Sequence, residues 1–448
     1  MWVYSERKKR LVKNKASLFH FFSLKVVPIS YQQASPQVWY NKNMDKKQLS
    51  LWSLYDFANS VVYINFILYF AQWIVVDAGL SDFSYNAIFA ITTVILLFSA
   101  PILAARTDLH GGGKFWLNIS TVCTFFFYGL VAILASMNSN IWLIALFFLI
   151  GQYFYQLSFV FYNPMLDEIA DDAHKSRVSG IGNFSSSLGF VVGILITLPF
   201  ADSRITPLLI SVPVFFILAL PMMIFFKESK KHVNEIDTSL TQNENKTSIR
   251  KMITFFAASA ATPMLVAFFF FNDALLTVSN NYSIYLERVF HSPDTAKSIL
   301  LLAILVMSAI GSVIAGWLGD KIGALRTLKY IMFGWVVALP ILALAPNFLV
   351  AAILSPIMGL LIGSAWTVTR AYLTAVLPKK DMRYGFSFYT IAERFSTLIG
   401  PLTWGGIIWV MGTQVLAYRI AVGAMTVFVV VGLILLHYWK RPIISLGV

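Results

Sequence analysis

The sequence LWSLYDFANS at positions 51–60 runs directly into the apolar segment 61–76. Together these residues are long and apolar enough to cross a bilayer, which takes about 20 residues in a helix. The segment nevertheless carries a carboxylate, Asp56, and an amide, Asn59. At 100° per residue these two share a helix face with Tyr63. A membrane carboxylate is costly unless it faces protein or water, so this face is predicted to line a polar interior.

The composition of the whole chain is that of a helical membrane protein with many spans. Of its 448 residues, 58% are hydrophobic and only 12% are charged, whereas soluble proteins carry about 25% charged residues. The net charge is +13, and in a membrane protein basic residues report topology rather than nucleic-acid binding. With a single cysteine, Cys123, no intramolecular disulfide forms.

Apolar segments of sufficient length predict twelve membrane helices in two groups of six. In the first half they are expected near residues 51–76, 84–105, 115–136, 140–165, 178–200 and 205–226, and in the second half near 252–286, 294–318, 326–346, 348–377, 384–411 and 415–439.

This pattern divides the chain into four parts. They are a basic tail (1–43), a six-helix half (44–226), a polar linker (227–251) and a second six-helix half with a short tail (252–448). We expect the native start at Met44; the alternative is that 1–43 is a disordered or surface-lying basic tail.

The basic residues are distributed unequally between the two sides of the membrane. The side that receives both termini and the linker takes most of them, while the other side clearly receives only Arg204, Arg288 and Lys297. Because cytoplasmic loops carry the excess of Lys and Arg, both termini and the linker are predicted to be cytoplasmic.

The two halves echo each other in a short charged connection. Asp108 and Lys114 follow the second predicted span, and Asp320 and Arg326 follow the eighth. A repeat of about half the chain is typical of transporters built from two six-helix halves. Glycines at 316–323 are expected to let the eighth and ninth helices turn tightly and approach closely. The alternative interpretation is an ordinary charged turn.

Several motifs carry a resemblance to a known family. They are YDFANS (55–60), FYNPML (161–166), FFND (270–273), and Arg370 followed by Leu377–Pro378. Over about residues 48–440 the chain resembles the vacuole effluxer family of the major facilitator superfamily. That family includes bacterial "unknown major facilitator" proteins and a fungal vacuolar amino-acid exporter tied to autophagy. The sequence departs from the family at Ala274, where the family often has glycine.

The resemblance implies a fold, a cavity and a gate. The fold is the twelve-helix major facilitator fold, with helices 1, 4, 7 and 10 around a central cavity. The charged connections resemble the loop signature of that superfamily, whose acidic and basic residues form a cytoplasmic gate. In the first copy Leu109 stands where the signature has a basic residue, so the second copy matches better.

Polar side chains at helical spacing mark the fourth, seventh, tenth and eleventh spans. The main candidates for substrate binding or coupling there are Gln152, Gln156, Asp273, Thr277, Arg370 and Glu393, besides Asp56, Asn59 and Tyr63 in the first span. The alternative for the fourth span is hydrogen bonding between helices, and for Asp56 it is a helix cap at headgroup level.

Two kinds of chemistry follow from these candidates. The guanidinium of Arg370 suits a substrate carboxylate in a forked geometry; the alternative is a buried pair with Glu393 or Asp56. The acids Asp56, Asp273 and Glu393 are candidates for proton coupling, since burial lets a carboxyl titrate near neutral pH.

These observations predict a secondary transporter of small polar solutes that works by alternating access in the bilayer. The resemblance and Arg370 favour amino-acid efflux. Protons are the candidate coupling ion, and we expect a monomer in a bacterial cytoplasmic membrane. One alternative is an exporter of drugs or sugars. Alternatives from other classes are a membrane-embedded enzyme acting on lipid-linked substrates, and a scaffold that transports nothing. We expect no catalytic residues, metal, cofactor or nucleic-acid partner.

Overall fold

A computed structural model describes residues 45–169, 175–228, 261–377 and 395–438, together with residues 389, 392 and 393. All of them belong to one compact unit, Asn43–Val448. The predicted basic tail (1–43), nearly all of the linker and much of the predicted span 384–411 therefore lie outside the described residues.

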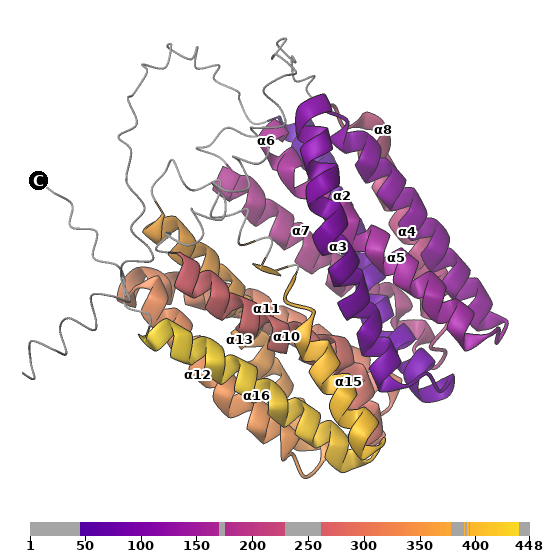
Figure 1. The fold of residues 1–448 in the computed structure, drawn as a ribbon, viewed down its shortest axis with the longest axis vertical. Helices are drawn as coiled ribbons and strands as arrows, with labels where there is room; N and C mark the ends of the chain where they lie inside the picture. The colour runs from indigo at the N-terminus through magenta and orange to yellow at the C-terminus, as the bar shows by residue number, and fades with distance from the viewer. Residues whose placement is uncertain are drawn as a thin grey trace, which may run out of the picture. The chain divides into compact units, whose positions relative to one another are not determined.

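The described part of the chain is helical throughout, and Figure 1 colours its first half from indigo to magenta and its second half from salmon to yellow. The first half contains α2 (Lys46–Asn65), η2 (Phe66–Phe70), η3 (Trp73–Asp77), α3 (Asp82–His110), α4 (Gly113–Ser136), α5 (Ile141–Tyr162), η4 (Asn163–Met165), α6 (Leu166–Ile169), α7 (Lys175–Thr197), η5 (Leu198–Phe200) and α8 (Thr206–Phe225). The second half contains α10 (Thr262–Phe290), α11 (Asp294–Ile322), α12 (Ala324–Ala343), α13 (Phe348–Val376), α15 (Ile399–Met411) and α16 (Val415–Tyr438).

Eleven helices among the described residues are long and apolar enough to span a membrane, and each coincides with a predicted span. The twelfth predicted span, 384–411, is represented by the shorter apolar helix α15. Several helices begin where a side chain caps the first turn: Ser81, Asn140 and Asn347 each accept a hydrogen bond from a backbone N–H there. Such caps satisfy donors that have no partner within the helix.

The first span is not a regular α-helix. Its second part contains two π-helical segments, η2 and η3. A π-turn carries an extra residue, so the side chains beyond it are rotated relative to a 100° projection. Beyond the first π-helical segment, the side chain of Gln72 accepts a hydrogen bond from Lys297 in the second half, a contact that the 100° projection did not predict.

Each half is a bundle of its own, and three pairs of elements form the most extensive contacts between the two among the described residues. Within the first half α2 packs on α7 and α8, and within the second α11 packs on α13. Between the halves α3 contacts α15, α7 contacts α11, and η2 contacts α10. We call the end of the bundle that holds Asp77, Arg204 and Asp294 the distal end.

Glycine permits close packing at particular crossings. A Cβ on Gly311 would lie 2.1 Å from the carbonyl oxygen of Leu360 on α13. Gly323 adopts φ +92°, which confirms the predicted turn after the eighth span. The expected close approach of the eighth and ninth helices at Gly316 is wrong, because a Cβ there would meet nothing within 4 Å.

This difference yields a matched pair of variants on α11. We expect Gly311→Ala to lower the stability of the detergent-solubilised protein by about 1–3 kcal/mol, because the added methyl group forces α11 and α13 apart. Gly316→Ala should be neutral or slightly stabilising, since alanine is the better helix former. Thermal unfolding of both variants measures this, and equal melting temperatures would contradict the packing.

Candidate functional site

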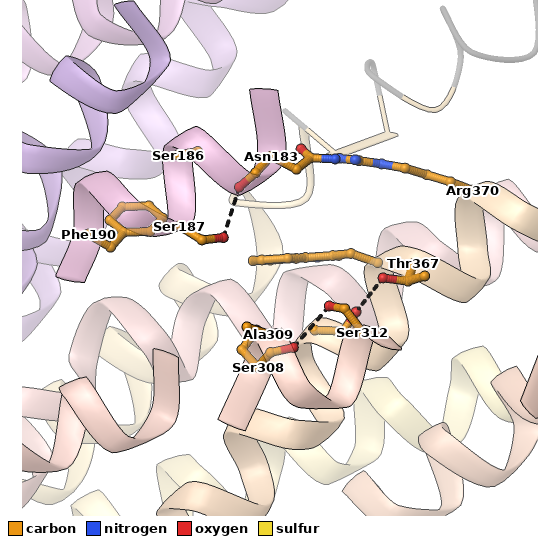
Figure 2. Close-up of a pocket in the computed structure, with 11 residues that line it drawn as sticks. Asn183, Ser186, Ser187, Phe190, Ser308, Ala309, Ser312, Thr367 and Arg370 are labelled. Atoms are coloured by element: carbon orange, nitrogen blue, oxygen red, sulfur yellow. Dashed lines mark hydrogen bonds between the residues drawn. The ribbon is translucent and has the colours of Figure 1, made fainter. Parts of the chain in front are cut away.

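A pocket of about 130 Å³ lies between the two halves. Its wall combines α7 of the first half with α11 and α13 of the second, and Figure 2 shows the side chains. The lining residues are Asn183, Ser186, Ser187, Phe190, Ser308, Ala309, Ser312, Gly363, Trp366, Thr367 and Arg370. We call this the interface pocket. It is small, its lining mixes hydroxyl and amide side chains with apolar ones, and Arg370 is the one cationic residue among the described lining residues.

Arg370 is the charged member of the interface pocket. In Figure 2 its side chain extends from α13 toward Asn183 on α7. The guanidinium carbon lies 5.8 Å from the centre of the Tyr389 ring, and the charges of Glu393 and Asp56 also act on it. One acidic charge from each half therefore acts on Arg370, that of Asp56 from the first and that of Glu393 from the second. These are the two partners that the alternative of a buried pair named.

The pocket wall differs from the cavity that the sequence predicted. The wall comes from the fifth, eighth and tenth spans, so it shares only the tenth with the cavity of helices 1, 4, 7 and 10 that the resemblance implies. Among the described lining residues, Arg370 is the one that was predicted to bind substrate, and the central cavity itself stays a prediction. The sequence reasoning missed Asn183, Ser186 and Ser187. The serine run 185–187 in an otherwise apolar span was the available signal.

The predicted polar residues of the first and fourth spans form contacts between helices. Asn59 is buried and donates to the carbonyl of Tyr55 in its own helix. Tyr63 donates to Asn280 across the halves, 3.1 Å away. Gln152 accepts a 2.7 Å hydrogen bond from Tyr128, and Gln156 is buried. The hydrogen bond from Tyr128 on α4 to Gln152 on α5 joins two helices, as the alternative interpretation of the fourth span predicted.

The predicted residues of the seventh span lie next to the eleventh. Asp273 and Thr277 are both fully buried. Asp273 accepts hydrogen bonds from the backbone N–H groups of Ile399 and Gly400. Both side chains crowd Gly400, where a Cβ would lie 2.3 Å from Thr277 Oγ1 and 2.7 Å from Asp273 Oδ1.

An ion-pair cluster joins the halves at the distal end, and the sequence reasoning did not assemble it. Arg204 of the first half binds Asp77 at 2.7 Å, Glu287 at 2.9 Å and Asp294 at 2.8 Å. Lys297, whose side chain is only 1% exposed, binds Glu287 and Asp294 as well. We call these five residues the distal lock. The cluster therefore contains Arg204 and Lys297, two of the three basic residues that the charge distribution placed on this side of the membrane.

The distal lock favours the charged form of Arg204. Arg204 lies in the connection between two spans, outside both. Burial alone would lower the pKa of its guanidinium, but the hydrogen bond and charge of Asp294, with the charges of Asp77 and Glu287, raise the pKa above its ordinary value. A buried cation held in this way is costly to separate from its partners.

Further polar contacts continue from the distal lock along the first span. Ser283 donates to the carbonyl of Ile67 at 2.8 Å, and the hydroxyl groups of Tyr69 and Ser298 lie 2.9 Å apart. Together with the contacts of Tyr63 and Gln72 these form a series of bonds between the halves, which we call the distal ladder.

The sequence and the fold both match known transporters. The model of the Major Facilitator Superfamily matches residues 52–307 and 264–445. The chain belongs to the Major Facilitator Superfamily. The predicted all-helical fold of two six-helix halves is thereby confirmed, and the protein is an integral membrane transporter.

Two bacterial relatives are similar in sequence to this superfamily member. The uncharacterized MFS-type transporter YxiO of Bacillus subtilis (strain 168) is 25% identical over 424 residues, which covers 88% of this chain and 94% of the relative. The fosmidomycin resistance protein of Escherichia coli (strain K12) is 25% identical over 221 residues, covering 46% of this chain and 50% of that protein.

Solved structures of other transporters share the fold. The bacterial homolog of the human lysosomal transporter Spinster, in its inward-facing and unoccupied conformation, aligns with a TM-score of 0.67 at 14% identity. The alignment covers 88% of this chain and 97% of that one. The nucleoside transporter NupG aligns with a TM-score of 0.65 at 14% identity, covering 87% of this chain and 99% of that one.

The predicted cytoplasmic gate residues lie at the end opposite the distal lock. Lys114 donates to the carbonyls of Ile224 and Phe226 at the end of α8, which links α4 to α8 within one half. The side chain of Asp108 lies outside the described residues. Asp320 and Arg326 are exposed, and the gate stays a prediction.

The distal lock gives a direct test of how the transporter is held closed. In a Cys123→Ser background, a cysteine replaces buried Ser283 and reports access from the distal side. We expect Arg204→Gln to speed its labelling by an impermeant thiol reagent in intact cells at least about tenfold, which corresponds to about 1.4 kcal/mol of lost closed-state stability.

The control for this test is Arg419→Gln, since Arg419 binds backbone carbonyls of Ala343 and Ala345 within one half. Its labelling rate should equal that of the parent. If Arg204→Gln and Arg419→Gln label alike, the distal lock does not hold the halves together.

Proposed function

We propose that this transporter exports small amino acids from the cytoplasm by alternating access, binding the amino-acid carboxylate at Arg370. The observation that carries the proposal is the guanidinium of Arg370 in a polar pocket between the halves. A guanidinium offers a planar fork of N–H donors that fits a carboxylate, and it remains charged at any physiological pH.

The dimensions of the interface pocket support a small cargo. Its volume of about 130 Å³ is close to that of an engineered protein cavity of about 150 Å³ that holds one benzene molecule. Pockets for drug-sized ligands are typically about 300–1,000 Å³. A molecule with the size of a small amino acid therefore suits the pocket better than a drug or a sugar.

The polar wall supports a hydrogen-bonding cargo. Ser186, Ser308 and Thr367 contribute hydroxyl groups, which can either donate or accept a hydrogen bond. Asp56 and Glu393, whose charges act on Arg370, supply the negative charge that an amino-acid ammonium group or a coupling proton needs. The resemblance of the motifs at 55–60 and 270–273 to the vacuole effluxer family points to the same cargo class.

The proposal also includes orientation and coupling. It places both termini and the linker in the cytoplasm, in a bacterial cytoplasmic membrane, on the strength of the Lys and Arg distribution. It assigns proton coupling to Asp56 and Glu393, and it treats the transporter as a monomer.

A drug is the second candidate cargo. The observation that favours it is the similarity to the fosmidomycin resistance protein, although that similarity covers about half of each chain. Fosmidomycin therefore belongs in the cargo panel.

The test is uptake by proteoliposomes that contain the purified protein, with labelled alanine compared with labelled ethylamine, which lacks the carboxylate. We expect alanine but not ethylamine to be transported. Arg370→Lys keeps the charge but loses the fork, and should reduce alanine transport at least about tenfold, because one hydrogen bond to a charged group contributes about 1.5–3 kcal/mol.

A matched pair on α13 is the control. Thr367 lines the interface pocket, while Thr369 is buried and donates to Ala365 in its own helix. Thr367→Val should lower alanine transport about fivefold, the cost of one hydrogen bond, and Thr369→Val should not. Equal transport of alanine and ethylamine, or transport of fosmidomycin alone, would overturn the proposal.

A further inference from the structure

Asn272 and Asp273, the polar end of the FFND motif, are adjacent residues of α10 and both are fully buried. They face a break in the eleventh span. Residues 392, 393 and 395 are helical, residues 396–398 are not, and α15 begins at Ile399. Each side of such a break has backbone groups that lack partners within the helix.

Asn272 binds the side of the break that leads back to the interface pocket. Its amide nitrogen donates to Ser396 Oγ at 2.5 Å and to the carbonyl of Glu393 at 3.4 Å. Its amide oxygen accepts from the indole N–H of Trp366 at 3.1 Å. Since Trp366 lines the interface pocket, Asn272 connects the pocket wall to the segment that carries Glu393.

Asp273 binds the other side of the break. Its Oδ2 accepts from the N–H groups of Ile399 at 3.2 Å and Gly400 at 2.8 Å. The residue before α15 is Leu398, which provides no side-chain cap. A carboxylate at a helix N-terminus is favoured because it satisfies free N–H donors and the positive end of the helix dipole.

The break also touches the first half. The hydroxyl groups of Thr397 and Thr93 on α3 lie 2.8 Å apart, and α15 packs along α3. The segment before the break carries Tyr389 and Glu393 to Arg370, while the segment after it is fixed against the other half.

We infer that Asn272 and Asp273 are positioning residues that hold the two sides of the break in the eleventh span, and thereby set where Glu393 and Tyr389 stand relative to Arg370. This inference rests on the proposed role of Arg370 in substrate binding. It gives Asp273 a different role from the proton coupling that the sequence suggested, because one oxygen of its carboxyl group, Oδ2, already accepts from two backbone donors.

The two roles of Asp273 predict different results for conservative substitution. An asparagine oxygen still accepts hydrogen bonds at a helix N-terminus, whereas alanine cannot. In the positioning role, Asp273→Asn affects proton-gradient-driven transport and substrate exchange by the same factor. In the coupling role, Asp273→Asn abolishes gradient-driven transport and spares exchange.

The first measurement is hydrogen–deuterium exchange of the amides of Ile399 and Gly400 in the purified full-length protein, which requires no cargo. We expect exchange at least about fivefold faster in Asp273→Ala than in the parent, and within about twofold of the parent in Asp273→Asn. Unchanged exchange in Asp273→Ala would overturn the inference.

A second pair of variants tests the inference independently, in case Asp273→Ala does not fold. Gly400→Ala places a methyl group against Asp273 and Thr277, whereas a Cβ on Gly406 meets nothing within 4 Å. Exchange at Ile399 should rise in Gly400→Ala and not in Gly406→Ala. We call the contacts of Asn272 and Asp273 with the two sides of the break the clamp. Equal exchange in the two variants would count against the clamp.

The second measurement is the ratio of gradient-driven alanine uptake to alanine exchange in proteoliposomes. We expect Asp273→Asn to leave this ratio within about twofold of the parent, and a ratio that falls to zero would overturn the positioning role. If the parent transports no amino acid, the proposed function fails by itself, and the exchange rates at Ile399 and Gly400 still decide whether the clamp exists.

Discussion

The distal ladder is the interaction on which the arrangement of the two halves depends. It runs from Tyr63 and Asn280 through Ile67 and Ser283 to the hydrogen bond that Lys297 donates to Gln72. A single polar contact within a membrane contributes only about 0.6 kcal/mol on average. Moving a two-state equilibrium from 1:99 to 99:1 needs about 5.5 kcal/mol. Many bonds must therefore form and break together, which makes the closed distal end a discrete state rather than one that opens gradually.

The interface pocket is the second place where the halves share charge. Arg370 comes from the second half, and its acidic neighbours come from both. Under the proposed function, a cargo carboxylate that binds Arg370 would compete with those acids and so change the balance of charge between the halves. The clamp of Asn272 and Asp273 lies between the pocket wall and the eleventh span. Binding at Arg370 and movement of the helices thus have a direct physical connection.

The sequence predicted the helices well and their contacts poorly. Length and hydropathy are local properties, so eleven of the twelve predicted spans appear as membrane-length helices in the described part of the chain. The π-helical segments η2 and η3 cannot be read from a regular 100° projection, so the contact between Gln72 and Lys297 was not predicted. The distal lock needs Arg204, Glu287 and Asp294, which are distant in the sequence and become neighbours only when the halves meet. Pocket residues such as Ser186 and Ser308 resemble ordinary small residues of helix interfaces.

A cross-link across the distal ladder tests whether the ladder opens and closes during transport. Ser283 Oγ lies 2.8 Å from the carbonyl oxygen of Ile67 in the other half, so a short, reducible bis-methanethiosulfonate reagent can join cysteines placed at these two positions. The measurement is alanine transport by Ile67→Cys/Ser283→Cys, made in a Cys123→Ser background, before and after treatment with the reagent. If the ladder must open, the cross-link stops transport, reduction restores it, and neither single-cysteine variant responds. Transport at the parent rate by the fully cross-linked protein would show that the ladder does not open.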